Sequence, residues 1–227
     1  NILENIEKNR EELLNEINIS HLNSKFKGSK VTKLVAVSKK QDENKIDTAI
    51  QIGQRIFGEN RVQEARQRWE ERLKHIDDLE LRLIGPLQTN KVKQALKLFD
   101  IIETVDREKL AKEIHLHFDN KVKTKSFFIQ INTGSESQKS GILPLESDSF
   151  IKYCVNDLKL PVVGLMCIPP YEEVSAMHFC LLKKIADRNQ LSELSMGMSE
   201  DFKEGIKFGA TSVRIGTKFF GQRTIVL

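Results

Sequence analysis

The chain has 227 residues, of which 39% are hydrophobic and 30% are charged, the composition of an ordinary globular protein. Its 36 Lys and Arg and 32 Asp and Glu leave a net charge of +4 with the signs interspersed, so nucleic acid is not an expected partner. No apolar run approaches the roughly 20 residues of a membrane helix, and no signal peptide is apparent, so we expect no membrane partner.

Cysteine and histidine spacing argues against disulfides and metal. The three cysteines, Cys154, Cys167 and Cys180, show no CxxC spacing and cannot pair completely, which favours a reduced, cytoplasmic protein. His115 and His117 lie two residues apart, a spacing that points two rings away from each other on a helix. No metal site is therefore expected.

The first 17 residues predict an amphipathic helix, because Leu3, Ile6, Leu13, Leu14 and Ile17 lie among charged residues. Eight short apolar runs follow the break at Gly28, and each has the length of a β-strand. The predicted strands are residues 34–37, 55–57, 81–84, 101–104, 127–131, 162–166, 193–195 and 212–215.

Segments with helical periodicity separate these strands, and their predicted starts are Asp42, Asn90, Asp106 and Ser199. Strands that alternate with helices of this length predict a parallel sheet. Eight such units in a chain of this size predict an α/β fold, a closed (β/α)8 TIM barrel preceded by one extra helix. No linker divides the sequence, so we expect a single domain over residues 1–227.

Lys39 lies two residues after the end of the first predicted strand. An amine that leaves a buried core at a strand tip is poorly solvated, and its neutral, nucleophilic form becomes accessible. Such a lysine is suited to an imine with a carbonyl compound, and pyridoxal phosphate is the commonest cofactor of this kind. The ordinary alternative is a surface lysine that closes a strand.

Ser199, Gly216 and Thr217 follow the seventh and eighth predicted strands. Barrels of this type frequently bind phosphate between these two loops, through backbone N–H groups at a helix N-terminus. Ser199 has the position of a helix N-cap, Gly216 allows close approach of the backbone, and Thr217 adds a hydroxyl. The alternative is a simple helix cap and a turn.

Arg214 lies within the otherwise apolar eighth strand, where it alternates with Val213 and Ile215. A guanidinium inside a barrel needs a partner, and one candidate is the ring nitrogen of pyridoxal phosphate. A charged arginine there would keep this nitrogen unprotonated and weaken the ring as an electron sink. The alternative is a buried ion pair with Glu59 or Asp106.

With these residues assembled, the chain resembles the pyridoxal phosphate homeostasis protein family (the YggS/PROSC type) from about residue 34 to residue 221. The resemblance depends on several ordered motifs. They are Ala36-Val-Ser-Lys39, Phe57-Gly-Glu-Asn60 with Val62-Gln-Glu64, Ile84-Gly-Pro-Leu-Gln-Thr-Asn-Lys91, Glu103-Thr-Val-Asp106, Gln130-Ile-Asn132 with Lys139-Ser-Gly141, Gly164-Leu-Met166, Leu194-Ser-Met-Gly-Met-Ser199 and Val213-Arg-Ile-Gly-Thr217.

The resemblance implies a barrel like the N-terminal domain of alanine racemase. It also implies a site for pyridoxal 5'-phosphate in which the cofactor forms an imine with Lys39. Asn60 would lie near the ring and Arg214 toward the pyridine nitrogen. The phosphate would lie among the remaining three residues, Ser199, Gly216 and Thr217.

The chain departs from the family pattern at three places. Lys40-Gln41-Asp42 stands where the family usually has Thr-Lys-Pro, Arg61 where it usually has Tyr, and Leu81-Arg82 where it usually has an aromatic residue and His. These changes add cations near the expected site but leave the lysine, the arginine and the phosphate loops in place.

The function that we favour is that of a monomeric binding protein without catalytic turnover. It would hold pyridoxal 5'-phosphate and deliver it to apoenzymes in intracellular vitamin B6 homeostasis. The first alternative is a fold-type III enzyme such as an amino-acid racemase, which needs acid–base groups on both faces of the cofactor. The only tyrosines, Tyr153 and Tyr171, lie in no matching motif. The second alternative is a cofactor-free barrel that binds a phosphorylated metabolite or a protein.

Overall fold

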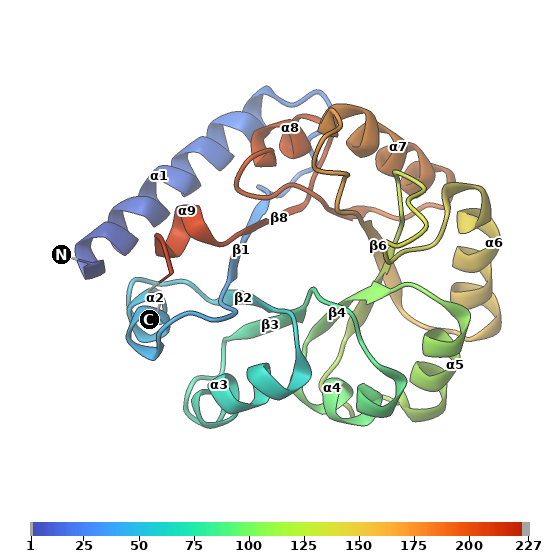
Figure 1. Cartoon of the computed structure of the whole chain (residues 1–227), viewed down its shortest axis with the longest axis horizontal. Helices are drawn as coiled ribbons and strands as arrows, with labels where there is room; N and C mark the ends of the chain where they lie inside the picture. The colour runs from blue at the N-terminus through green and yellow to red at the C-terminus, as the bar shows by residue number, and fades with distance from the viewer. Residues whose placement is uncertain (1, 224–227) are drawn as a thin grey trace.

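The computed structural model describes residues 2–223, with side chains from residue 5 onward. Eight parallel strands follow one another around a closed barrel, and β1 completes the ring by pairing with β8 (Figure 1). The helices surround this ring, as alternating strands and helices require. The predicted (β/α)8 barrel is confirmed.

All eight predicted strands are present, and no boundary differs from its prediction by more than two residues. The strands are β1 (Lys33–Val37), β2 (Ile56–Glu59), β3 (Glu80–Leu83), β4 (Ile101–Val105), β5 (Ser126–Gln130), β6 (Val162–Met166), β7 (Glu193–Ser195) and β8 (Ser212–Ile215).

The helices of the described chain include several short turns of 3₁₀ or π type. The α-helices are α1 (Ile2–Asn23), α2 (Glu43–Gln51), α3 (Val62–His75), α4 (Val92–Leu98), α5 (Glu108–His117), α6 (Ser147–Lys152), α7 (Ser175–Arg188), α8 (Phe202–Lys207) and α9 (Thr217–Phe220). The short turns are η1 (Thr89–Lys91), η2 (Pro144–Glu146) and η3 (Tyr153–Asp157).

The predicted start of α8 at Ser199 is wrong, because Asp201 occupies the N-cap position. Its carboxylate accepts the backbone N–H of Met198 at 2.8 Å and the hydroxyl of Ser175 at 2.7 Å. These two bonds hold residues 198–201 in a turn, so the helix begins only at Phe202. The starts predicted at Asn90 and Asp106 each precede the N-cap residue by one position, whereas Asp42 occupies the N-cap position of α2 as expected.

The extra N-terminal helix is present and continues to Asn23, beyond the predicted end at residue 17. It crosses the outside of the barrel and packs against α2, α8 and α9 (Figure 1). Ile6, Leu13 and Ile17 are buried in this contact, but Leu14 is 37% exposed, so its assignment to the apolar face is wrong. Residue 1 of the prediction and the side chain of Leu3 lie outside the described part of the chain.

The core between the barrel wall and the helices is apolar. Outward-facing strand residues such as Phe57, Phe127 and Val213 are completely buried there. Each such side chain contributes about 1.5–3 kcal/mol by leaving water. This apolar layer fixes the positions of the strands, and the strands in turn fix the positions of the loops at their C-terminal ends.

The interior of the barrel, in contrast, contains a chain of polar contacts. Arg82 of β3 pairs with Glu103 of β4 at 3.1 Å, and Glu103 accepts the hydroxyl of Ser195 in β7 at 2.5 Å. The Ser195 oxygen in turn accepts an N–H of Arg214 in β8 at 2.6 Å. All four side chains are at most 3% exposed. Buried charges are tolerated here because each has a partner.

We expect the Glu103→Leu variant to lose about 3–5 kcal/mol of unfolding free energy, because Arg82 would keep its buried charge without its buried partner. Chemical denaturation measures this loss. The exposed Glu108, which pairs with Lys112 at 3.0 Å, offers the control variant Glu108→Gln, which should change stability little. Equal stability of the Leu variant and the wild type would contradict this account of the barrel interior.

Candidate functional site

The closure of the barrel brings the predicted site residues of the first and last strands to the same edge. Val35 lies beside Arg214 and Ala36 beside Ile215 in the β1–β8 ladder. Lys39 comes two residues after the end of β1 and Gly216 directly after the end of β8. In a (β/α)8 barrel this C-terminal edge is where active sites form.

Asn60 follows β2, the other neighbour of β1, and is half-buried. Gly85 packs directly against the backbone of Asn60, since a Cβ at residue 85 would lie only 2.7 Å from the Asn60 Cα. The loop after β3 can therefore pack directly on the backbone of Asn60 only with glycine at this point. Arg214 in β8, Lys39 after β1 and Asn60 after β2 are thus carried by three adjacent strands or the loops that follow them.

Lys39 itself is half-buried, and its pKa is lowered. Burial is the main cause, and the positive charges of Arg223 and Lys40 add to it, while Glu64 and Glu59 act in the opposite direction. Its neutral amine is therefore reached at a lower pH than that of an ordinary lysine. This is the environment that a strand-tip position predicts.

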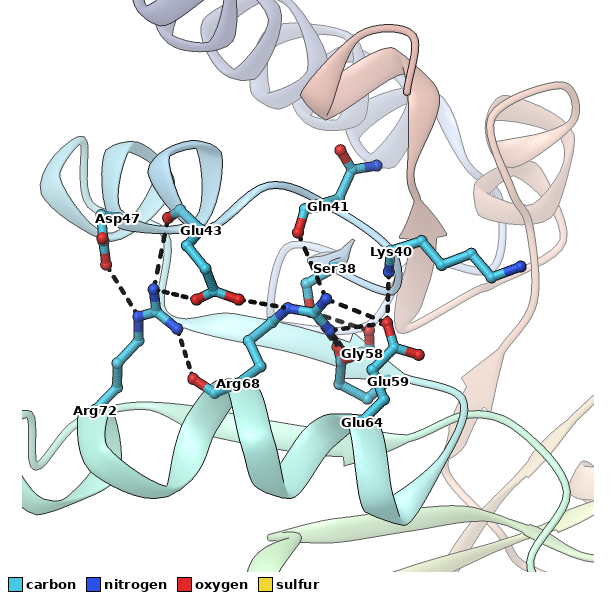
Figure 2. A network of polar contacts seen from close by, with 10 residues as sticks. All are labelled: Ser38, Lys40, Gln41, Glu43, Asp47, Gly58, Glu59, Glu64, Arg68 and Arg72. Carbon is cyan, nitrogen blue, oxygen red and sulfur yellow. Dashed lines mark hydrogen bonds and ion pairs between the residues drawn. The ribbon is translucent and has the colours of Figure 1, made fainter. Parts of the chain in front are cut away.

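The turn that carries Lys39 is attached to side chains from β2 and α3 (Figure 2). Ser38 donates its hydroxyl to Glu59 at 2.8 Å, and the backbone N–H of Lys40 donates to Glu64 at 2.6 Å. Lys40 has a left-handed backbone conformation with φ of 57°, which costs a residue other than glycine about 1–2 kcal/mol. The hydrogen bond to a charged carboxylate, about 1.5–3 kcal/mol, is sufficient to offset this cost.

Arg68 of α3 joins the two carboxylates of this network. It pairs with Glu59 at 2.6 Å and with Glu64 at 3.1 Å. Burial raises the pKa of Glu59 to about 7, and the nearby Arg68 charge only partly offsets this effect. Glu59 therefore gains or loses its proton near neutral pH, whereas the pKa of Glu64 is lowered, since its bonds from Lys40 and Arg68 outweigh the effect of burial.

Arg214 does not form the predicted alternative ion pair, since Glu59 pairs with Arg68 and Asp106 with Arg107. Its guanidinium instead donates to the Ser195 hydroxyl and, at 2.9 Å, to the backbone carbonyl of Cys167. Both partners are neutral groups. The Ser195 hydroxyl lies between Arg214 and Glu103, the carboxylate of this series of contacts. Arg214 is therefore fixed by two hydrogen bonds but has no direct ion pair in this network.

The three residues predicted to hold phosphate differ in their surroundings. Ser199 is half-buried in the turn before α8 and, with Lys218, lines a cavity of about 550 Å³. Thr217 is exposed at the start of α9. A Cβ at Gly216 would meet only Val37, at an ordinary 3.7 Å, so the protein's own packing does not require glycine there. The free space beside its backbone fits the close approach of a ligand.

Glu64, Arg68, Glu103 and Ser195 were missed by the sequence predictions. Glu64 and Arg68 are separated by four residues on a helix, a spacing that signals an ion pair, and Glu103 interrupts an apolar strand. Among residues 2–223, no group of His, Cys, Asp or Glu has the arrangement of a metal site. No helix in this part of the chain is long and apolar enough to span a bilayer.

Comparison with known proteins identifies close relatives along most of the chain. The pyridoxal phosphate homeostasis protein of Aquifex aeolicus is 39% identical over 208 residues, which cover 87% of this chain and 90% of the relative. That of Escherichia coli K12 is 35% identical over 203 residues, covering 84% and 85%.

Solved structures show the same similarity. PipY of Synechococcus elongatus, solved without pyridoxal phosphate, superposes with a TM-score of 0.83 at 31% identity, covering 95% of this chain and all of that chain. Its structure with pyridoxal phosphate bound gives 0.78 at 29% identity and the same coverage. Alanine racemase of Bartonella henselae, at 16% identity and a TM-score of 0.71, covers 98% of this chain and 61% of that chain and shares the fold.

The family model of the alanine racemase N-terminal domain matches residues 16–224. Both this match and the extent of the similarity to the curated relatives agree with the closed barrel and its order of strands. The chain therefore belongs to the pyridoxal phosphate homeostasis proteins, within the alanine racemase N-terminal domain family.

Proposed function

We propose that this protein binds pyridoxal 5'-phosphate as a reversible imine on Lys39 and acts in intracellular vitamin B6 homeostasis by holding and delivering the cofactor. The observation that carries the proposal is the half-buried Lys39, with its lowered pKa, just beyond the end of β1, which pairs with the strand that carries Arg214. The names of the relatives and the pyridoxal phosphate-bound structure of PipY support it.

The chemistry that the site would supply is simple. With the cofactor bound, Lys39 would hold it through its neutral amine, which would replace the aldehyde oxygen with release of water. Delivery would be an exchange of amines in which an incoming amine takes the place of Lys39, which would leave as the free amine. Neither step needs an additional oxidant, reductant or metal.

The other predicted residues fit this ligand in type. Arg214 is a fixed donor without a carboxylate in direct contact, which suits a pyridine nitrogen that stays unprotonated. Ser199, Gly216 and Thr217 offer hydroxyl and backbone donors for the phosphate, and Asn60 directly follows β2, the strand that pairs with β1. A cofactor ring bound in this way is a weak electron sink, so the site favours holding over turnover.

The racemase alternative would require a second acid–base group. Tyr171 is 99% exposed on the loop between β6 and α7, and Tyr153 packs on the apolar layer outside the barrel wall. We therefore place the binding protein first. The proposal further includes a monomer formed by one domain, cytoplasmic location, and apoenzymes as recipients.

Addition of pyridoxal 5'-phosphate to the purified protein should produce an imine absorption band, and borohydride reduction should fix the adduct on Lys39. The Lys39→Ala variant should lose both signals, while Lys40→Gln should keep them. Peptide mass spectrometry identifies the modified residue. An adduct on other lysines alone, or no adduct at all, would favour the cofactor-free alternative.

Replacement of Lys40 by Gln removes one of the positive charges that lower the pKa of Lys39. The pKa of Lys39 should then rise, so less neutral amine is present at a given pH. The midpoint of imine formation should move to higher pH in an absorbance titration. Lys125, which is exposed and precedes β5 at the opposite end of the barrel, gives the control variant Lys125→Gln, whose midpoint should not move; equal midpoints for both variants would contradict the electrostatic account.

A further inference from the structure

The short turn that carries Lys39 is held by side chains that belong to a different βα unit. Three of its residues, Ser38, Lys40 and Gln41, contact β2 or α3 (Figure 2). These three contacts come from the residues on either side of Lys39 and not from its own side chain. The backbone on both sides of Lys39 is therefore fixed while its amine stays available.

Glu64 makes the shortest of these three contacts. Its Oε1 atom accepts the backbone N–H of Lys40 at 2.6 Å, compared with 2.8 Å from Ser38 to Glu59 and 3.5 Å from Arg68 to the Gln41 carbonyl. Glu64 lies in the first turn of α3, where the helix dipole favours a negative charge. A charged acceptor on a rigid helix is a suitable anchor for a backbone amide.

The anchor is itself held in place. Both terminal nitrogens of Arg68 donate to the same Glu64 oxygen at 3.1 Å. Arg68 is 8% exposed in its side chain and is fixed on its other side by Glu59. The Glu64 carboxylate is therefore fixed in position, and the backbone N–H of Lys40 must point toward it to keep the hydrogen bond.

The backbone of Lys40 makes this anchor necessary. Its left-handed conformation, with φ of 57°, is unfavourable for a side chain with a Cβ. Without an acceptor at Glu64, the turn itself would be closed only by the longer bond from the Gln41 N–H to the Ser38 carbonyl, at 3.2 Å. We expect Lys40 to relax toward negative φ in that case. Because Lys39 is the preceding residue, such a change would redirect its side chain at the barrel rim.

We propose that Glu64 is a positioning residue for Lys39: by holding the Lys40 amide, it directs the lysine amine toward the strand edge shared with Arg214. This inference rests on the proposed function, since it assigns to Glu64 the task of favouring the imine on Lys39. The role is one of geometry, and it depends on an acceptor atom at position 64 more than on a charge there.

Two variants of Glu64 separate geometry from charge. Glu64→Gln and Glu64→Ala both remove the negative charge near Lys39, but only Gln keeps an oxygen that accepts the Lys40 amide. We expect the affinity for pyridoxal 5'-phosphate, titrated by imine absorbance, to remain within about threefold of wild type in the Gln variant. The Ala variant should bind about tenfold more weakly, the effect of one lost hydrogen bond.

Hydrogen exchange gives a second measurement that needs no cofactor. The Lys40 amide should be protected in the wild type and in Glu64→Gln, and should exchange faster in Glu64→Ala. The control is Asp47→Ala, which removes the 2.9 Å contact with Arg72 at the far end of the same network. This variant should leave both the affinity and the Lys40 exchange unchanged, even if it lowers thermal stability.

The outcomes are distinguishable. An imine on Lys39 in the wild type, together with equal affinities of the Gln and Ala variants, would overturn the positioning role alone. Unchanged Lys40 exchange in the Ala variant would also overturn it. The absence of any Lys39 imine in the wild type would overturn the proposed function, and the role of Glu64 with it.

Discussion

The chain of buried contacts Arg82–Glu103–Ser195–Arg214 is the interaction on which the rest of the barrel interior depends. It crosses from β3 and β4 to β7 and β8, so strands distant in sequence share one polar network. Removal of Arg82 or Glu103 leaves the other charge without its buried partner. The same chain keeps Arg214 in position without neutralising it directly, which links the stability of the barrel to the chemistry of its mouth.

The apolar layer outside the strands and the polar chain inside them have separate tasks. The outer layer supplies most of the favourable burial and is tolerant of the identity of its members as long as they are apolar. The polar network inside the barrel tolerates few substitutions, because its hydrogen bonds require particular atoms at particular positions. A barrel built in this way can be stable as a whole and still present one unneutralised cation at the edge where β1 and β8 meet.

Lys39 and Arg214 are held by independent means. Arg214 depends on the barrel interior, whereas the turn of Lys39 depends on Glu59 at the end of β2 and on Glu64 and Arg68 of α3 (Figure 2). A ligand that contacts both groups would therefore join two networks that are otherwise separate. In the proposed function this arrangement keeps a reactive aldehyde bound without an efficient electron sink, as a carrier requires.

Much of the fold was predictable from the sequence, because strand length, helical period and alternation are local properties of the chain. The position of Lys39 at a strand tip followed from the same patterns. Only the tertiary structure decided that Arg214 bonds to Ser195 instead of Glu59 or Asp106, that Asp201 and not Ser199 caps α8, and that Glu64 holds the amide of Lys40. Hydrogen-bond partners depend on strand register and on how distant segments meet when the barrel closes, and no local pattern carries that information.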